Sequence, residues 1–425
     1  MKIFSETYYK TTTSSHMAAV RSSLSDSFVY GNKPVAAPAT KSKVHIFPEN
    51  GSTEFLPGNT VRFVLPTGNR GEYLNCRQSY LRFRLYNLSD EVLALDKSAH
   101  SVFRALKVSA SGGAGGGVLE NIEEYNALVT TLYDLTGSSV QMSYAGTVAE
   151  GFNTSLPADS SKIFCIPLMS GVVGTMQQRY LPVGAMARTH LTMELTIKSQ
   201  DKLYAASPNP KAWAIMDVEY VCEMIHLDPT VDRALMEANS GGIVVPFATY
   251  SQHRWIAPAN SGSMSMAFSS PFKSLKTLIG IFRKDVSNYV TADYISKRTN
   301  PILDTGRYQF TINGVLTPSK PIGTNSEAFA EAQKAFHAYG CLEHMGVINH
   351  ANWTATDGTY AIAMDLESQS HKSMLSQNGV DVSTSVSHLT AQFAGQLATS
   401  LTVDLFSHYD SFIVIGADGL VNVFY

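Results

Sequence analysis

The sequence predicts an all-β protein made of two similar halves. Short segments in which apolar and polar residues alternate recur along most of the chain, which is the pattern of strands with one buried face. Both halves follow one order, from alternating strands through one amphipathic helix to further strands. A chain of 425 residues is also longer than one hydrophobic core usually grows, so two domains are expected.

The strands of the first half are predicted from period-2 alternation. The clearest segment is LRFRLYN (81–87), which places Leu81, Phe83 and Leu85 on one face and Arg82 on the other. The same pattern occurs in VRFVLP (61–66), LTMELTI (191–197) and AIMDVEYVCEMI (214–225). Each of these segments is expected to form a sandwich strand with one face in the core.

One helix is predicted in the first half, over LENIEEYNALVTTLYDL (119–135). Its apolar residues recur at helical spacing, and Gly137 follows as a stop signal. The residues that share the face are Leu119, Ile122, Tyr125, Val129 and Leu132.

The second half repeats this order with the strands LKTLIGIF (275–282) and YQFTING (308–314), followed by a helix over 325–340. Thr324 and Glu327 fit a capping box at the start of that helix, and Gly340 is expected to end it. Its apolar face is formed by Phe329, Ala332, Phe336 and Tyr339.

Two local sequence signals predict a linker helix and a C-terminal turn. The segment 228–242 predicts a short helix that starts at Asp228 with Pro229 in its first turn, and it is the expected linker between the domains. Near the C-terminus, Asp418-Gly419 predicts a tight turn between two strands.

Composition limits the possible partners. The net charge of -3 argues against a chain whose main task is to neutralise nucleic-acid phosphates. A charged fraction of only 16% suits a β protein whose surface is partly covered by neighbours. The start of the chain lacks the apolar core of a signal peptide, and no run approaches the roughly 18 apolar residues of a membrane span.

The sequence offers no pattern that favours catalysis, a cofactor or a metal. GGAGGG (112–117) lacks the Lys-Ser or Lys-Thr of a phosphate loop and predicts a flexible loop. The histidines 337, 344 and 350 lie near Cys341 and Glu343 but lack the spacing of a helical zinc motif. We therefore assign no catalytic, cofactor-binding or metal-binding residues, and we expect no cofactor and no small-molecule substrate.

Several stretches, in this order, resemble the double jelly-roll major capsid proteins of the Polinton, adintovirus and virophage group, within the lineage of adenovirus and tectivirus coats. The likeness covers most of 44–425. It is carried by FLPGNTVRFVLPTGNRGEYLNCRQSYLRFRLYN (55–87), GVLENIEEYNALVTTLYD (117–134), KSLKTLIGIFR (273–283), RYQFTINGVLTPSKPI (307–322), LSQNGVDVST (375–384) and the terminal YDSFIVIGADGLVNVFY (409–425).

This resemblance implies two tandem eight-stranded jelly rolls, at 43–226 and 243–425, joined by a linker with a short helix at 227–242 and preceded by a flexible N-terminal arm at 1–42. It implies a major capsid protein that is not an enzyme, forming homotrimers of near-hexagonal outline that tile an icosahedral shell of a DNA virus. The implied partners are further copies of the chain, penton and minor capsid proteins, and an inner membrane or the genome through the arm. Assembly is expected in the interior of the host cell.

Two other functions remain open at this point. A two-domain β sandwich can be a carbohydrate-binding lectin or a glycan-active enzyme, although Trp213, Trp255 and Trp353 are far apart in the sequence and have no acidic pair beside them. A spike or minor capsid component would form oligomers without tiling a shell.

Overall fold

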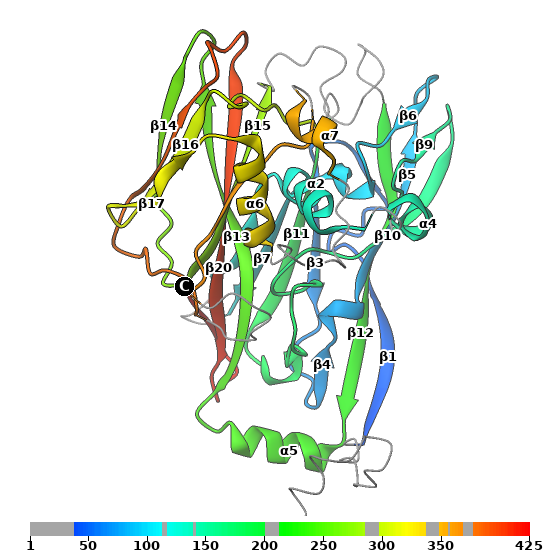
Figure 1. Ribbon diagram of the computed structural model, residues 1–425. Coiled ribbons are helices and arrows are strands. Elements are labelled where there is room, and N and C mark those ends of the chain that lie inside the picture. Colours follow the sequence, from blue (N-terminus) through cyan, green and yellow to red (C-terminus); the bar gives the residue numbers. More distant parts are fainter. Residues whose placement is uncertain are drawn as a thin grey trace, which may run out of the picture. The chain divides into compact units, whose positions relative to one another are not determined.

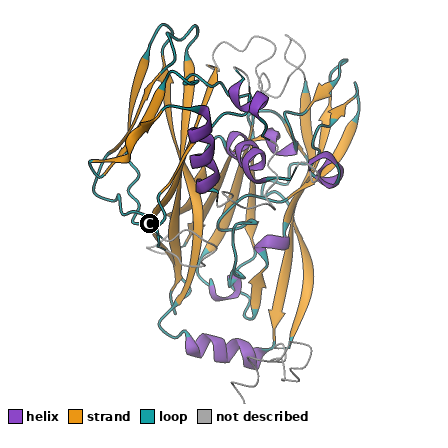
Figure 2. Ribbon diagram, viewed as in Figure 1, coloured by secondary structure: helices purple, strands orange, loops and turns teal. Residues whose placement is uncertain are grey.

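The structure is a computed structural model, and the residues it describes are 38–112, 117–138, 142–199, 212–284, 297–336, 348–355, 358–368 and 377–425. Residues 39–425 form one compact unit. Antiparallel sheets dominate it, and only a few short helices lie between the strands (Figure 2).

The first half consists of two four-stranded paths that are antiparallel throughout (Figure 1). One path has the order β1 (Ala39–Ile46), β12 (Trp213–Leu227), β5 (Tyr80–Asn87) and β10 (Ser161–Ile166). The other has the order β3 (Thr60–Leu65), β11 (His190–Ile197), β7 (Phe103–Ser111) and β8 (Gly117–Ile122). Short strands β2 (Glu54–Phe55) and β4 (Glu72–Leu74) also pair with β12, and β6 (Leu93–Ala94) pairs with β9 (Ser155–Leu156).

The second half repeats this arrangement. One path has the order β13 (Ile243–Ala257), β20 (Leu401–Ile415), β15 (Leu275–Lys284) and β18 (Ile362–Asp365), with β21 (Val421–Phe424) paired to β20. The other has the order β14 (Ser263–Phe268), β19 (Ser387–Gln392), β16 (Arg307–Ile312) and β17 (Val315–Ile322).

The two halves share one topology. When the eight main strands of each half are counted in chain order, both halves give the strand orders 1–8–3–6 and 2–7–4–5. Two packed four-stranded sheets of this kind form a jelly roll. The predicted pair of eight-stranded jelly rolls is therefore confirmed, and so is the repeated plan with one helix at the same point of each half.

The helix of the first half is shorter than predicted. Residues 117–122 form strand β8, and the helix α2 (Tyr125–Thr136) begins only after Glu124, whose φ of 48° breaks the chain direction. Prediction of a helix from Leu119 was wrong because Leu119 and Ile122 have helical spacing, whereas the chain pairs with β7 through a register shift at Leu119 that lets both residues be buried in a strand.

The other helices follow their capping signals. Helix α6 (Asn325–Ala335) starts as predicted, with the Thr324 hydroxyl accepting the Glu327 backbone N–H, but it ends at Ala335, before the predicted stop at Gly340. In α5 (Pro229–Ala238), the Asp228 carboxylate accepts the Thr230 N–H, as expected for the helix between the halves. Two shorter helices of five residues each also lie in the described part of the chain, α4 (Ala145–Ala149) and α7 (His350–Thr354).

The hydrophobic core follows the predicted alternation. In β5, Leu81, Phe83 and Leu85 are fully buried. Cys222 is also buried, as a small apolar residue of β12. At the C-terminus, Gly419 has a φ of 77° in the turn between β20 and β21, which confirms the predicted Asp-Gly turn.

Strand β1 begins at Ala39, within the segment assigned from sequence to the N-terminal arm. The remainder of that arm, up to residue 37, lies outside the described residues.

Candidate functional site

Charged side chains are buried where the two jelly rolls meet, and the first is Glu120 of β8. Its carboxylate accepts hydrogen bonds from the Thr249 hydroxyl of β13, the Ser170 hydroxyl and the Gly171 backbone N–H, the last at 2.8 Å. Glu120 is only 1% exposed, and burial raises the pKa of its carboxyl, an effect that these three donors partly offset. The contact with Thr249 links the two halves directly.

A second cluster joins the end of β8 to the second jelly roll through two arginines and two acids. The Glu124 carboxylate forms ion pairs with Arg254 at 3.0 Å and with Arg283 at 3.2 Å. Both arginines also bind the fully buried Asp404 of β20, Arg254 at 2.8 Å. Burial alone would raise the pKa of the Glu124 carboxyl, but the two guanidinium groups hold it below its usual value.

The third cluster holds helix α2 against the second jelly roll. The guanidinium of Arg298 donates to Asp134 at 2.8 Å and to the Thr131 hydroxyl at 3.0 Å, both on α2. It also donates to the backbone carbonyls of Thr359 and Tyr360, so it ties its own half together as well. The side chains of Arg298 and Asp134 are almost completely buried, and Lys97 makes a second ion pair with Asp134.

Two glycines allow the backbones of the halves to approach closely. A Cβ at Gly171 would lie 2.1 Å from the Ala248 carbonyl oxygen of β13, a distance that no side chain permits. At the other end of the unit, Gly419 approaches the Ala187 backbone nitrogen, and the Thr189 hydroxyl donates to the Gly419 carbonyl at 3.2 Å. These contacts fix the separation of the two jelly rolls.

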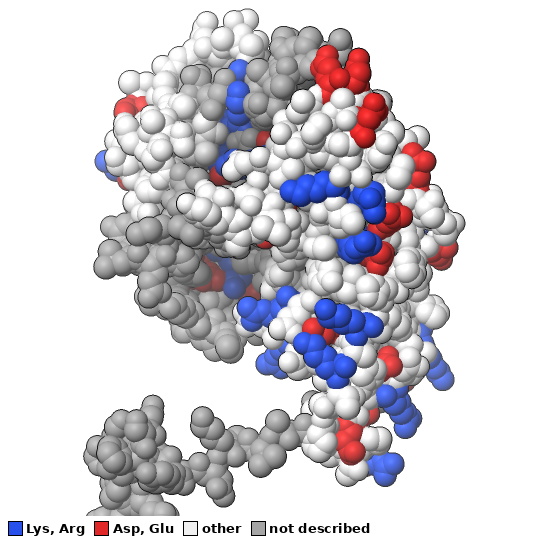
Figure 3. Space-filling view, turned by 90° about the vertical axis from the view of Figure 1, so that its right-hand side faces the viewer, with Lys and Arg blue, Asp and Glu red and all other residues white. Residues whose placement is uncertain are grey.

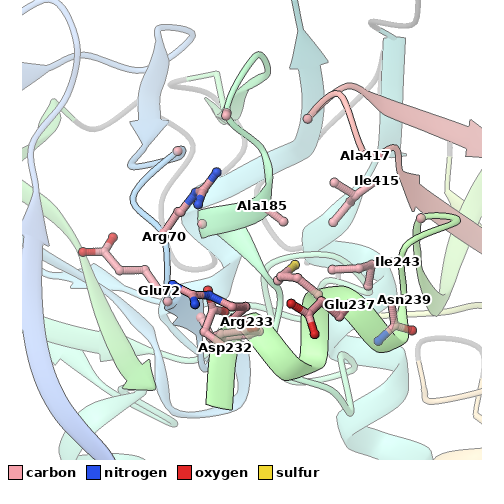
Figure 4. A pocket seen from close by; sticks show the side chains of 18 of the residues that line it. Arg70, Glu72, Ala185, Asp232, Arg233, Glu237, Asn239, Ile243, Ile415 and Ala417 are labelled. Carbon is pink, nitrogen blue, oxygen red and sulfur yellow. Dashed lines mark hydrogen bonds between the residues drawn. The ribbon is translucent and has the colours of Figure 1, made fainter. Parts of the chain in front are cut away.

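A pocket of about 600 Å³ lies between linker helix α5 and the turns of both halves (Figure 4). Its lining contains charged residues of both signs, among them Arg70, Arg233, Glu72 and Asp232. Within it the Tyr73 hydroxyl donates to Asp232 at 2.8 Å, which ties α5 to β4. Burial and this carboxylate raise the pKa of Tyr73.

The outer sheet of the first jelly roll carries charges of both signs, interspersed over the face shown in Figure 3. Arg84 pairs with Asp217 at 3.1 Å, and Lys41 pairs with Glu223 at 2.7 Å on neighbouring strands. A face with alternating signs is not the continuous basic track that binds nucleic-acid phosphates.

Most of the residues that the sequence analysis considered as metal ligands lie outside the described residues. His337, Cys341, Glu343 and His344 fall in the undescribed stretch 337–347, and the loop 113–116 is also undescribed. His350 is exposed at the first turn of α7. Across the described ranges, no three His, Cys, Asp or Glu side chains come together as a metal site. In the same ranges, no helix is long and apolar enough to cross a membrane.

Sequence reasoning did not identify the buried charges between the halves. Each partner is far away in the chain, as in the pair Glu120 and Thr249, which are 129 positions apart. The one available signal was Asp134, the single charged residue of a helix that is buried along almost its whole length.

No protein-family model matches the sequence, and no curated protein matches it. Among solved structures, the PBCV-1 virus capsid has a TM-score of 0.66 at 11% identity over 94% of this chain and 99% of that one. The Faustovirus major capsid protein has a TM-score of 0.56 at 7% identity, covering 93% of each chain.

A third solved structure, that of the Sputnik virophage, has a TM-score of 0.54 at 10% identity over 94% of this chain and 92% of that one. All three likenesses extend over nearly the full length of both chains. The chain thus has the double jelly-roll fold of viral major capsid protein structures.

The ion pairs between the halves should be essential to stability. Replacing Arg298 with Met removes four hydrogen bonds and one of the two cations that pair with the buried Asp134. We expect a loss of about 3 kcal/mol in the free energy of unfolding, the low end for a broken buried pair because Lys97 remains. The matched control Arg84→Met, in an exposed pair, should cost at most about 1 kcal/mol. Equal effects of the two variants in urea unfolding would contradict the assignment.

Glu120 should make stability depend on pH. A carboxyl whose pKa is higher in the folded state binds its proton more tightly there than in the unfolded chain. Its contribution to the free energy of unfolding is therefore lost as the pH rises above 4.5, the ordinary pKa of a glutamate. A glutamine does not titrate, so Glu120→Gln does not lose stability in this way. The free energy of unfolding of the variant, relative to that of the unchanged protein, should rise by up to about 1.4 kcal/mol per pH unit.

Melting temperatures between about pH 5 and about pH 8 provide the measurement for Glu120. The exposed Glu123, which pairs with Arg104, is the matched control, and Glu123→Gln should follow the unchanged protein. A Glu120→Gln difference that stays constant across this range would refute the prediction.

Proposed function

We propose that this chain is the major capsid protein of a DNA virus and that it acts by assembly rather than by catalysis. The observation that supports this best is the pair of jelly rolls with identical strand order, joined through buried ion pairs. An enzyme or a lectin functions through one catalytic or binding site. A shell instead needs a rigid subunit whose similar domains give it a regular outline. Similarity to capsid structures over almost the full length of the chain supports the same function.

In this proposal, three copies associate into a block of six similar jelly rolls with a near-hexagonal outline, and the blocks tile an icosahedral shell. A stable first association buries about 2,000–5,000 Å² of surface, and the contacts between blocks are smaller and more polar. Weak contacts between blocks allow misplaced ones to leave before the shell closes. The fixed join between the halves keeps the outline constant in every copy.

The proposal also covers domains, partners and location. It retains the predicted division into an arm at 1–42, jelly rolls at 43–226 and 243–425, and a linker at 227–242. The partners are other copies of the chain, penton and minor capsid proteins, and an inner membrane or the genome through the arm. The protein is placed in the virion after assembly inside the host cell.

The tryptophans do not favour the lectin alternative. Trp213 and Trp353 are buried at 1% and 3% exposure, so neither can form a platform for a sugar ring. Only Trp255 is exposed, on β13.

The mass and outline of the purified protein test the proposal. We expect light scattering to give three chain masses and negative-stain electron microscopy of the same peak to give a near-hexagonal top view. A monomer that still fails to associate at high concentration would count against the major capsid role.

The arm should be needed for particles but not for the fold. Deleting residues 1–38 leaves β1 intact, because the strand starts at Ala39. We expect the shortened protein to keep its melting temperature and its trimer mass while the yield of closed particles falls. If the shortened protein forms particles with normal yield and stability, the arm has no role in assembly.

A further inference from the structure

The linker helix α5 lies over a pocket that its own side chains do not fill. Of its ten residues only Asp232 is buried, and the hydrogen bond from the Tyr73 hydroxyl to Asp232 holds the helix to β4. The pocket between α5 and the turns of both halves has a volume of about 600 Å³ (Figure 4). Pockets of this size bury a drug-sized ligand, which is comparable to a few residues of a peptide.

The lining of the pocket carries an excess of negative charge. Asp232 already accepts the Tyr73 hydroxyl, and Asp418 accepts the Leu420 backbone N–H at 3.1 Å. Glu237 is exposed and, within the described part of the chain, has neither an ion pair nor a side-chain hydrogen bond. Its carboxylate is therefore available to a cation from outside the unit. The charged lining has a formal net charge of -2, from Glu72, Asp232, Glu237 and Asp418 against Arg70 and Arg233.

One end of the pocket is apolar. Ile243 of β13 and Ile415 of β20 line this end, and Figure 4 shows them together, apart from Arg70. Glu237 lies between this apolar end and the arginines in the same view. A fitting occupant therefore combines apolar side chains with a cationic group close to them.

The N-terminal arm contains a segment of this composition. Residues 1–38 include four Lys or Arg and two Asp or Glu, so their formal net charge is +2. The segment KIFSETYYK (2–10) places three aromatic side chains between Lys2 and Lys10. Its charge and its apolar content both complement the pocket.

The length of the chain allows this segment to reach another copy. Strand β1 begins at Ala39, which pairs with Leu227, a residue that lines the pocket. Lys10 precedes Ala39 by 29 positions, and a segment of that length extends over at most about 100 Å. A jelly roll of this size is roughly 40 Å across. Exchange of an identical segment between copies is also a low-cost way to link them.

We propose that residues 2–10 of one copy dock in the α5 pocket of a neighbouring copy. The Lys10 ammonium group then pairs with Glu237, and the aromatic side chains pack against Ile243 and Ile415. This inference rests on the proposed capsid function, since it names the surface that the arm contacts in the shell. Such a link joins copies without contributing to the fold of either one.

Cross-linking between two single variants of the full chain tests the exchange. Particles are assembled from a mixture of Lys10→Cys and Glu237→Cys chains and treated with a short bismaleimide. The mixture should give a linked dimer on a denaturing gel, and this dimer joins two different copies because neither variant carries both new thiols. Each variant assembled alone controls for the native cysteines.

A second position on the same helix is the matched control. Leu235 is 39% exposed on α5 but does not line the pocket. A mixture of Lys10→Cys and Leu235→Cys chains should therefore give much less linked dimer than the mixture with Glu237→Cys. Equal yields from the two mixtures would overturn docking in the pocket.

Reversal of the two charges is an independent test. Glu237→Lys should lower the yield of particles while the melting temperature and the trimer mass stay unchanged, because Glu237 has no partner to lose within the described unit. Adding Lys10→Glu should restore the yield, since it restores an attractive pair. For a partly exposed ion pair, the affinity of an arm for its pocket should change by up to about fivefold.

The outcomes separate the docking from the capsid function. A linked dimer from the Glu237 mixture, with restored yield after both charges are reversed, supports the proposal. If the double variant Lys10→Cys with Glu237→Cys gives only a linked monomer and the mixture gives no dimer, the segment occupies its own pocket and the exchange is overturned. Normal particles that give neither product overturn the docking and leave the capsid function in place. A chain that stays monomeric and forms no particles before any substitution overturns both.

Discussion

The structure depends on charged side chains that are buried between its two halves. Glu124 and Asp404 share two arginines across the join, and Arg298 reaches from one half into the helix of the other. Each of these charges would carry a large desolvation cost if its partner moved away. The halves therefore behave as one body, although each has the strand order of an independent sandwich. Apolar contact alone would hold the halves together but would resist sliding much less, because it has little directionality.

Duplication of the jelly roll did not produce two equivalent domains. Helices α2 and α6 occupy the same place in the strand order, yet α2 is buried by its surroundings and carries the buried Asp134, whereas α6 keeps Glu331 and Lys334 paired on its own surface. The position within the chain explains the difference. The first half has a covalently attached neighbour over this edge, whereas no other part of the chain within the described ranges covers the corresponding edge of the second half.

Local signals in the sequence predicted the parts of the fold that depend on neighbouring residues. Alternation identified β5, the Asp228-Pro229 start identified α5, and Asp418-Gly419 identified the last turn. The boundary between β8 and α2 was missed because Leu119 and Ile122 have helical spacing, and a strand accommodates them only through the register shift in its pairing with β7. The join between the halves could not be predicted from spacing, since Glu124 and Arg283 are 159 positions apart in the chain and no local pattern links them.

The pairing of first with last strands has a consequence for how the chain folds. In each half the first main strand lies beside the last, β1 beside β12 and β13 beside β20. Neither sandwich can close until its whole length has left the ribosome, and contacts of such long sequence separation form slowly. The first half can then close while Glu120, Glu124 and Asp134 still await partners that have not been synthesised. During that interval the newly closed domain presents an uncovered strand edge on which Glu124 lacks both arginines and Asp134 is paired with Lys97 alone. Such an exposed edge favours premature association.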